Sequence, residues 1–222
     1  MVALYMTNIE VKIVGEFLRN YESDLEYLVC FRRYMRGEIP SKDYSIRGNG
    51  SFYNFLTEFR IIRNIVQGGT HQLLDLTKAW CEGPEADEVD AFAQHLSKAD
   101  ISRGAILSSL ASKVLFLNNP QQLLPMDALA RKALNVRLNS YSAYSTELKT
   151  YSQKRQESLT EIMIFLNPIV SSIERSLMSE LPEIEKIRLN RLIDKMLWVQ
   201  GQQDRYNTEG GGNVLPDKKN MI

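Results

Sequence analysis

The segment that most constrains the fold is residues 108–134, which read SSLASKVLFLNNPQQLLPMDALARKAL. Up to Leu117 it is apolar, with small residues set among large ones, as is typical of a buried helix. Asn119 and Pro120 end that helix, because Asn tolerates the left-handed conformation and Pro disfavours helix in the residue before it. Asp127 is then placed to cap a second helix over 128–134. The segment therefore predicts two helices joined by a short turn.

The rest of the chain has apolar residues at helical spacing and no alternating, β-branched runs bounded by turns. We therefore predict an all-α fold, one multi-helix domain over 1–202, followed by a flexible tail over 203–222 that is rich in Gly and polar residues. The expected helices are 7–36, 51–67, 70–82, one that opens in the acidic stretch and ends near 96, 102–117, 128–134, 139–154, 157–179 and 183–199.

Charge is balanced over the chain but uneven along it. The 222 residues include 27 Lys or Arg and 27 Asp or Glu, so a nucleic-acid partner requires a local basic surface. Residues 128–155 carry six Lys or Arg and a single Glu, whereas residues 82–100 carry six Asp or Glu and a single Lys. We interpret the acidic stretch mainly as favourable charge at a helix start.

Cysteine, histidine and motif content narrows the classes of function. Cys30 and Cys81 form no disulfide framework, which favours a reducing, cytoplasmic compartment. With His71 and His95 as its histidines the chain suggests no zinc site, and no cofactor is expected. No apolar run approaches the roughly 20 residues of a membrane span, so no membrane partner is expected. A P-loop, a Rossmann glycine pattern and a Gly-x-Ser-x-Gly elbow are all absent, which disfavours nucleotide hydrolysis and serine-triad hydrolysis.

A lysine followed by a Pro-x-Asp element lies in the central segment: Lys113, then Pro125-Met126-Asp127, then Arg131. This arrangement resembles helix-hairpin-helix DNA glycosylases of the 8-oxoguanine type, including small bacterial proteins associated with anti-phage defence. A second, weaker similarity spans residues 191–201. The chain departs from that family in having Gly104 alone where a Gly-x-Gly hairpin is usual, and in a shorter interval between the lysine and the aspartate.

The resemblance implies a helix-hairpin-helix glycosylase fold, DNA as a partner and excision of a damaged or modified base. Lys113 would attack the sugar C1′ as an amine, and Asp127 would stabilise the developing positive charge or activate the nucleophile. The same residues also allow structural interpretations, in which Lys113 extends from a core helix and Asp127 is only a helix cap.

Candidate DNA contacts come from basic and small residues. Arg131 and Lys132, on the second helix of the central segment, would hold phosphates, and Ser109 and Ser112 would allow close approach of a phosphate or of another helix. A basic cluster that includes Arg33 and Arg36 ends the first helix, where it either offsets the helix dipole or contacts phosphate. Tyr141, Tyr144 and Tyr151, which alternate with basic residues, either pack in the core or touch the DNA backbone.

Two further hypotheses remain open beside a glycosylase. The chain could be a non-catalytic helical DNA- or protein-binding subunit of a multi-protein defence complex, or a module that binds only proteins. A basic groove that contains both Lys113 and Asp127 would favour catalysis. A basic face with the pair buried and joined in a mutual ion pair would favour the non-catalytic subunit. The acidic stretch beside an exposed apolar surface would favour a protein-binding module.

Overall fold

The computed structural model describes residues 6–209, with the backbone alone for 204–209. This part of the chain is helical over most of its length and contains no strand, which confirms the all-α prediction. None of its helices is both long and apolar enough to cross a membrane. The elements are α1 (Asn8–Met35), α2 (Ser41–Tyr44), α3 (Phe52–Glu58), the 3-10 turn η1 (Ile62–Asn64), α4 (Thr70–Cys81), α5 (Val89–Lys98), α6 (Ser108–Phe116), α7 (Ala128–Ala133), α8 (Tyr141–Lys154), α9 (Gln156–Leu177) and α10 (Ile184–Glu209).

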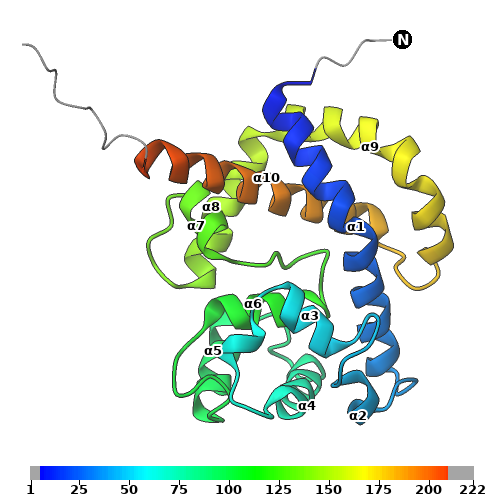
Figure 1. The fold of residues 1–222 in the computed structure, drawn as a ribbon, viewed down its shortest axis with the longest axis vertical. Helices are drawn as coiled ribbons and strands as arrows, with labels where there is room; N and C mark the ends of the chain where they lie inside the picture. The colour runs from blue at the N-terminus through cyan, green and yellow to red at the C-terminus, as the bar shows by residue number, and fades with distance from the viewer. Residues whose placement is uncertain (1–5, 210–222) are drawn as a thin grey trace, which may run out of the picture.

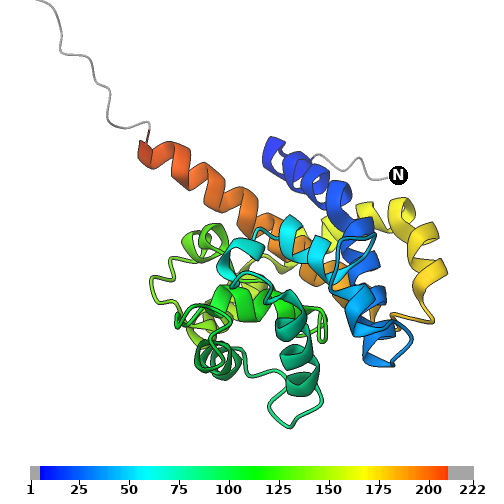
Figure 2. The same cartoon turned by 60° about the horizontal axis from the view of Figure 1, so that its bottom comes forward.

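The helices form two groups that share α1 (Figure 1). Helices α2 to α6 make one group, and α7 to α10 make the other, while α1 runs along both (Figures 1 and 2). Helix α10 packs on α7 and α1, and α5 packs on α6 to form a helical hairpin. Helix α9 bends along its length in Figure 1, as expected from Pro168, which lacks a backbone N–H to donate inside the helix.

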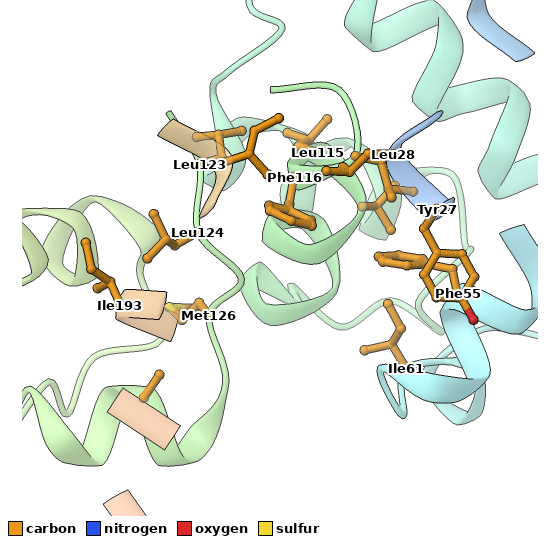
Figure 3. Close-up of a cluster of buried hydrophobic side chains, with 14 of the residues drawn as sticks. Tyr27, Leu28, Phe55, Ile61, Leu115, Phe116, Leu123, Leu124, Met126 and Ile193 are labelled. Carbon is orange, nitrogen blue, oxygen red and sulfur yellow. The ribbon is translucent and has the colours of Figure 1, made fainter. Parts of the chain in front are cut away.

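One continuous hydrophobic core joins the two groups. Figure 3 shows Phe116 of α6 between side chains of both, with Phe55 and Ile61 on one side and Met126 on the other. All four side chains are at most 1% exposed. The chain between α6 and α7 therefore crosses from one group to the other through the core, and it carries Asp127 to the boundary between them.

Four helices end in the same way, with the residue after the cap in the left-handed conformation. These residues are Gly37 after α1, Arg60 after α3, Asp100 after α5 and Asn135 after α7, and each has φ between 55° and 80°. At each site two backbone N–H groups donate back into the last turn; at α3, Arg60 N donates to Thr57 O and the next N–H donates to Leu56 O. This is the Schellman motif, which satisfies carbonyls that the helix leaves unpaired.

Several predicted helix bounds were wrong. The helix expected over 51–67 ends at Glu58, because the chain turns at Arg60 and continues as η1. The helix expected to start at 102 starts at Ser108, and Asp100 follows the end of α5. The last helix continues to Glu209, ten residues beyond Val199. Residues 210–222 of the predicted tail lie outside the described residues.

The acidic stretch has a structural role at Asp90. Its carboxylate accepts hydrogen bonds from the backbone N–H of Tyr141 and of Ser142, at 2.8 and 3.0 Å. The hydroxyls of Ser108 and Ser140 donate to it as well, both at 2.9 Å. Asp90 of α5 therefore caps the first turn of α8 and ties both helices to α6, as the interpretation of these carboxylates as structural predicts.

Candidate functional site

A pocket of about 680 Å³ lies at the boundary between the two groups of helices. Its walls come from α1, from α3 and η1, from α6, from the start of α7 and from α10, as the arrangement in Figure 1 allows. Ligand sites are common at such boundaries, where rigid elements from distant parts of the sequence converge. The polar and aromatic side chains that line it include Glu16, Arg19, Asp24, Glu58, Phe59, Arg60, Arg63, Ser109, Lys113, Asp127, Arg191, Asp194, Lys195 and Trp198.

Lys113 of α6 lies in this pocket and is only 9% exposed. Its Nζ donates a hydrogen bond to the carbonyl oxygen of Phe59 at 3.1 Å, at the C-terminal end of α3. Desolvation lowers the pKa of the Lys113 ammonium below its ordinary value; nearby carboxylates, Asp127 first among them, oppose this, and Arg63 adds to it. The pocket therefore holds an amine that loses its proton more readily than a surface lysine.

Asp127 lies in the same pocket at the start of α7. Its Oδ1 accepts a hydrogen bond from the backbone N–H of Ala130 at 2.8 Å, so the predicted helix cap is confirmed. Desolvation raises the pKa of the Asp127 carboxyl, the Ala130 N–H and Lys113 oppose this, and Asp194 raises the pKa further. Within residues 6–203 no ion pair joins Lys113 to Asp127, so the two groups share a pocket without neutralising each other directly.

A buried arginine forms the back of the pocket. Arg191 of α10 is 1% exposed and forms an ion pair with Asp24 of α1, with 2.7 Å between Nη2 and Oδ2. A second carboxylate, Asp194, lies 3.2 Å from its Nη1. The guanidinium also faces the rings of Phe59 and Phe116, at 5.7 and 5.1 Å from their centres. Burial disfavours the charge of Arg191, but the two carboxylates hold its pKa above the ordinary value.

The charge of the pocket lining is mixed. Six Lys or Arg and five Asp or Glu line it. Arg19 pairs with Glu16 at 3.0 Å, and Lys195 lies 3.9 Å from Asp194. Arg60 and Arg63 are exposed, and within the described part of the chain neither side chain forms an ion pair or a hydrogen bond. The unpaired positive charge of the lining is therefore concentrated at Arg60 and Arg63.

Of the other predicted site residues, Ser109 lines the pocket and Ser112 does not. Ser112 is fully buried, where its hydroxyl donates to Ser109 O and accepts from the N–H of Met126. Arg131 donates to the carbonyl of Leu138, and neither it nor Lys132 lines the pocket. We therefore assign Ser112 a packing role that positions the chain just before Asp127.

Arg33 and Arg36 also lie away from the pocket. Both pair with Glu180, at 3.2 and 2.9 Å, and Arg36 pairs with Glu38 as well. These contacts join the end of α1 to the segment between α9 and α10. The structure thus gives the basic cluster a role in joining elements, in addition to its place at a helix C-terminus.

Two of the interleaved tyrosines are core residues that support the site. Tyr141 and Tyr144 are at most 7% exposed. The Tyr141 hydroxyl accepts from the N–H of Leu124, and the Tyr144 hydroxyl donates to the carbonyl of Pro125, at 3.0 and 3.3 Å. They fix the chain that presents Asp127. Of the two interpretations of these tyrosines, the structure therefore favours core packing.

Sequence reasoning missed part of the pocket, namely Phe59, Arg60, Arg63 and Lys195. No local signal marks Phe59, Arg60 and Arg63, because their position depends on the turn at Arg60, where glycine would be the usual residue.

Comparisons of this chain with protein-family models, with curated proteins and with solved structures find no match.

Proposed function

We propose that this protein is a DNA glycosylase-like enzyme that removes a damaged or modified base and uses Lys113 as its nucleophile. The observation that carries the proposal is the pocket that holds both Lys113 and Asp127, with the lysine desolvated and the carboxylate close enough to affect its pKa. A role in defence against phage is part of the same proposal and rests on the resemblance of the central segment.

The chemistry starts from the neutral amine of Lys113. The amine attacks C1′ of an extruded nucleotide, the C1′–N bond breaks, and the base leaves with the bonding electrons and takes up a proton. Ring opening of the sugar then gives an imine between Nζ and C1′. A lowered lysine pKa supports this step, because only the deprotonated amine can attack at neutral pH.

Asp127 supports the same reaction electrostatically. Positive charge develops on the sugar as the base departs, and a fixed carboxylate in a partly dry pocket stabilises that charge more than water does. Its hydrogen bond to Ala130 N–H holds the carboxylate in place before the reaction begins. The raised pKa of Asp127 means that its charge, and with it this stabilisation, is lost as the pH falls through a value above that of an ordinary aspartate.

The helical hairpin α5–α6 supports DNA as the partner. Lys113 lies on its second helix, and the loop between the helices carries Ile106, which is 53% exposed. An exposed apolar side chain just before the helix that carries Lys113 can insert where a base has left the stack. The mixed charge of the pocket implies modest affinity from electrostatics alone.

The test is base release from duplexes that contain oxidised guanine or modified phage bases, with unmodified duplex as the blank. Lys113→Gln and Asp127→Asn are compared with Lys42→Gln, an exposed lysine on α2. The proposal predicts release by the wild type and by Lys42→Gln, and a loss of at least a hundredfold in the other two variants. Release that is unchanged in Lys113→Gln would exclude Lys113 as the nucleophile.

A second candidate function is a non-catalytic DNA- or protein-binding subunit. One observation favours it: the bond from Lys113 Nζ to Phe59 O gives the lysine a structural role as a cap for α3. If Lys113 has only that role, Lys113→Gln would lower the stability of the fold. The wild type would then bind DNA or protein but release no base from any duplex. Circular dichroism of each variant, measured beside the release assay, separates the two candidates.

A further inference from the structure

Arg60 occupies a backbone position that favours glycine. Its φ is +57°, and it follows the cap of α3 in the Schellman motif, where α1 has Gly37. A side chain at positive φ brings Cβ close to the following carbonyl, so arginine is less stable here than glycine would be. The backbone therefore does not account for an arginine at this position.

The side-chain contacts do not account for it either. Arg19, Arg32 and Arg191 all pair with carboxylates. By contrast, the guanidinium of Arg60, like that of Arg63 three residues later, has no ion pair or hydrogen bond among the described residues. Both side chains are exposed at the pocket, so the two positive charges are available to a ligand.

The location of these two residues relates them to the proposed nucleophile. The carbonyl that accepts from Lys113 Nζ belongs to Phe59, the residue directly before Arg60. Arg60 and Arg63 line the same pocket as Lys113, and the charge of Arg63 lowers the pKa of the Lys113 ammonium, after the larger effect of desolvation. An anion bound by Arg60 and Arg63 would therefore share the pocket with the amine.

We propose that Arg60 and Arg63 together bind one backbone phosphate that flanks the nucleotide attacked by Lys113. This inference rests on the proposed function, since it takes DNA as the ligand of the pocket. Guanidinium groups suit a phosphodiester because each offers a planar pair of N–H donors to two phosphate oxygens. Such a contact fixes the position of the sugar without reading the base. The phosphate contact accounts for an arginine at a position where glycine would be more stable.

The experiment measures stability and DNA affinity in the same variants. The probe is a duplex with a tetrahydrofuran abasic analogue, which binds but cannot react, and affinity is read by fluorescence anisotropy. Arg60→Gly is expected to raise the melting temperature by about 2 to 4 °C and to weaken binding on the order of tenfold. Arg63→Gln is expected to weaken binding similarly without raising the melting temperature.

The matched control is Asn135→Gly. Asn135 has φ +56° in the same position of the motif after α7, and it does not line the pocket. This substitution is expected to raise the melting temperature slightly, since Asn tolerates the conformation better than Arg, and to leave affinity unchanged. The control separates relief of backbone strain from loss of the guanidinium.

A scan with neutral methylphosphonates then locates the phosphate. Replacing the bound phosphate should cost the wild type about tenfold in affinity at one flanking position, and should cost the Arg60→Gly, Arg63→Gln double variant little. Equal affinity of wild type and both single variants, or a double variant that still loses affinity at that position, would overturn the phosphate assignment alone. Failure to bind any DNA would overturn the proposed function and, with it, the assignment.

Discussion

At the scale of single residues, Lys113 combines a stabilising hydrogen bond with a lowered pKa. Both follow from burial, because the side chain that reaches Phe59 O also leaves water. The sequence already suggested that Lys113 and Asp127 act together, since both residues belong to one helix–turn–helix element. The lowered lysine pKa could not be read from that element, because the lysine is buried where it reaches Phe59 O, and the charge of Arg63 lowers its pKa further; both residues lie about fifty positions earlier in the chain.

The first prediction concerns that pKa. Reductive methylation with ¹³C-formaldehyde, followed by an NMR titration, should show one dimethyl-lysine resonance that titrates below 10.5, the ordinary lysine value, because desolvation disfavours the ammonium. The resonance should be absent in Lys113→Gln and present in Lys42→Gln. A Lys113 resonance that titrates at or above 10.5 would contradict the account of its reactivity.

At the scale of elements, the sequence predicted where helices exist better than where they end. The cap and capping box of α1, at Thr7 and Glu10, are local features, because both depend on neighbouring residues. The end of α3 and the start of α6 were missed, since the chain turns at Arg60 and Asp100, residues that give no glycine signal. Tertiary contacts of the following residues hold these turns, and a local pattern does not encode them.

Asp90 gives a prediction about pH. Desolvation raises the pKa of its carboxyl, but the N–H groups of Tyr141 and Ser142 outweigh this, and the net direction is downward. A carboxyl with a lowered folded-state pKa stabilises the fold above its unfolded-state pKa, and this contribution is lost as the pH falls through the folded-state value. Asp90→Ala should therefore cost about 2 kcal/mol in free energy of unfolding at pH 7.

Urea unfolding across pH 7 to 3 provides the measurement. The difference between wild type and Asp90→Ala should shrink toward the acid end, while Glu85→Ala, an exposed carboxylate in the same stretch, should match the wild type throughout. A difference that stays constant with pH would show that the carboxylate charge contributes nothing.

Gly201 gives a prediction about helix packing. A Cβ added there would overlap the carbonyl oxygen of Leu129, so α10 and α7 approach each other closely at this residue. Gly201→Ala should lower the free energy of unfolding by roughly 1 to 3 kcal/mol, despite the better helix propensity of alanine. Gly15→Ala on α1, where nothing lies within 4 Å, should instead raise it by about 0.5 to 1 kcal/mol. Thermal unfolding of both variants tests this, and a stabilised Gly201→Ala would refute the close approach.

At the scale of the whole molecule, the pocket exists because two groups of helices meet. Asp24 and Arg191 are 167 positions apart in the sequence, yet they pair in the interior, and the Arg191 guanidinium faces the ring of Phe116 in the other group. The all-α class followed from periodicity alone. The contact between the two groups of helices could not be predicted in this way, because an ion pair between distant helices leaves no pattern in the sequence of either helix.

The ion pair predicts a large effect on stability. Asp24→Ala removes the closest ion-pair partner of the buried Arg191 and leaves Asp194 as its partner, which should lower the free energy of unfolding by roughly 3 to 5 kcal/mol. Asp43→Ala, an exposed aspartate on α2, should change it by less than about 0.5 kcal/mol. Chemical denaturation of both variants gives the comparison. A loss below about 1 kcal/mol in Asp24→Ala would mean that the pair does not hold α1 to α10.

The central claim is that the pocket contains a reactive amine at Lys113. Borohydride trapping on a duplex with an aldehydic abasic site, followed by peptide mapping of the adduct, tests this claim most directly. Nζ condenses with the C1′ aldehyde and releases water, and borohydride reduces the imine to a stable amine. The account predicts one major adduct, mapped to Lys113, that is lost in Lys113→Gln and retained in Lys42→Gln. An adduct on another lysine, or none while the duplex remains bound, would contradict it.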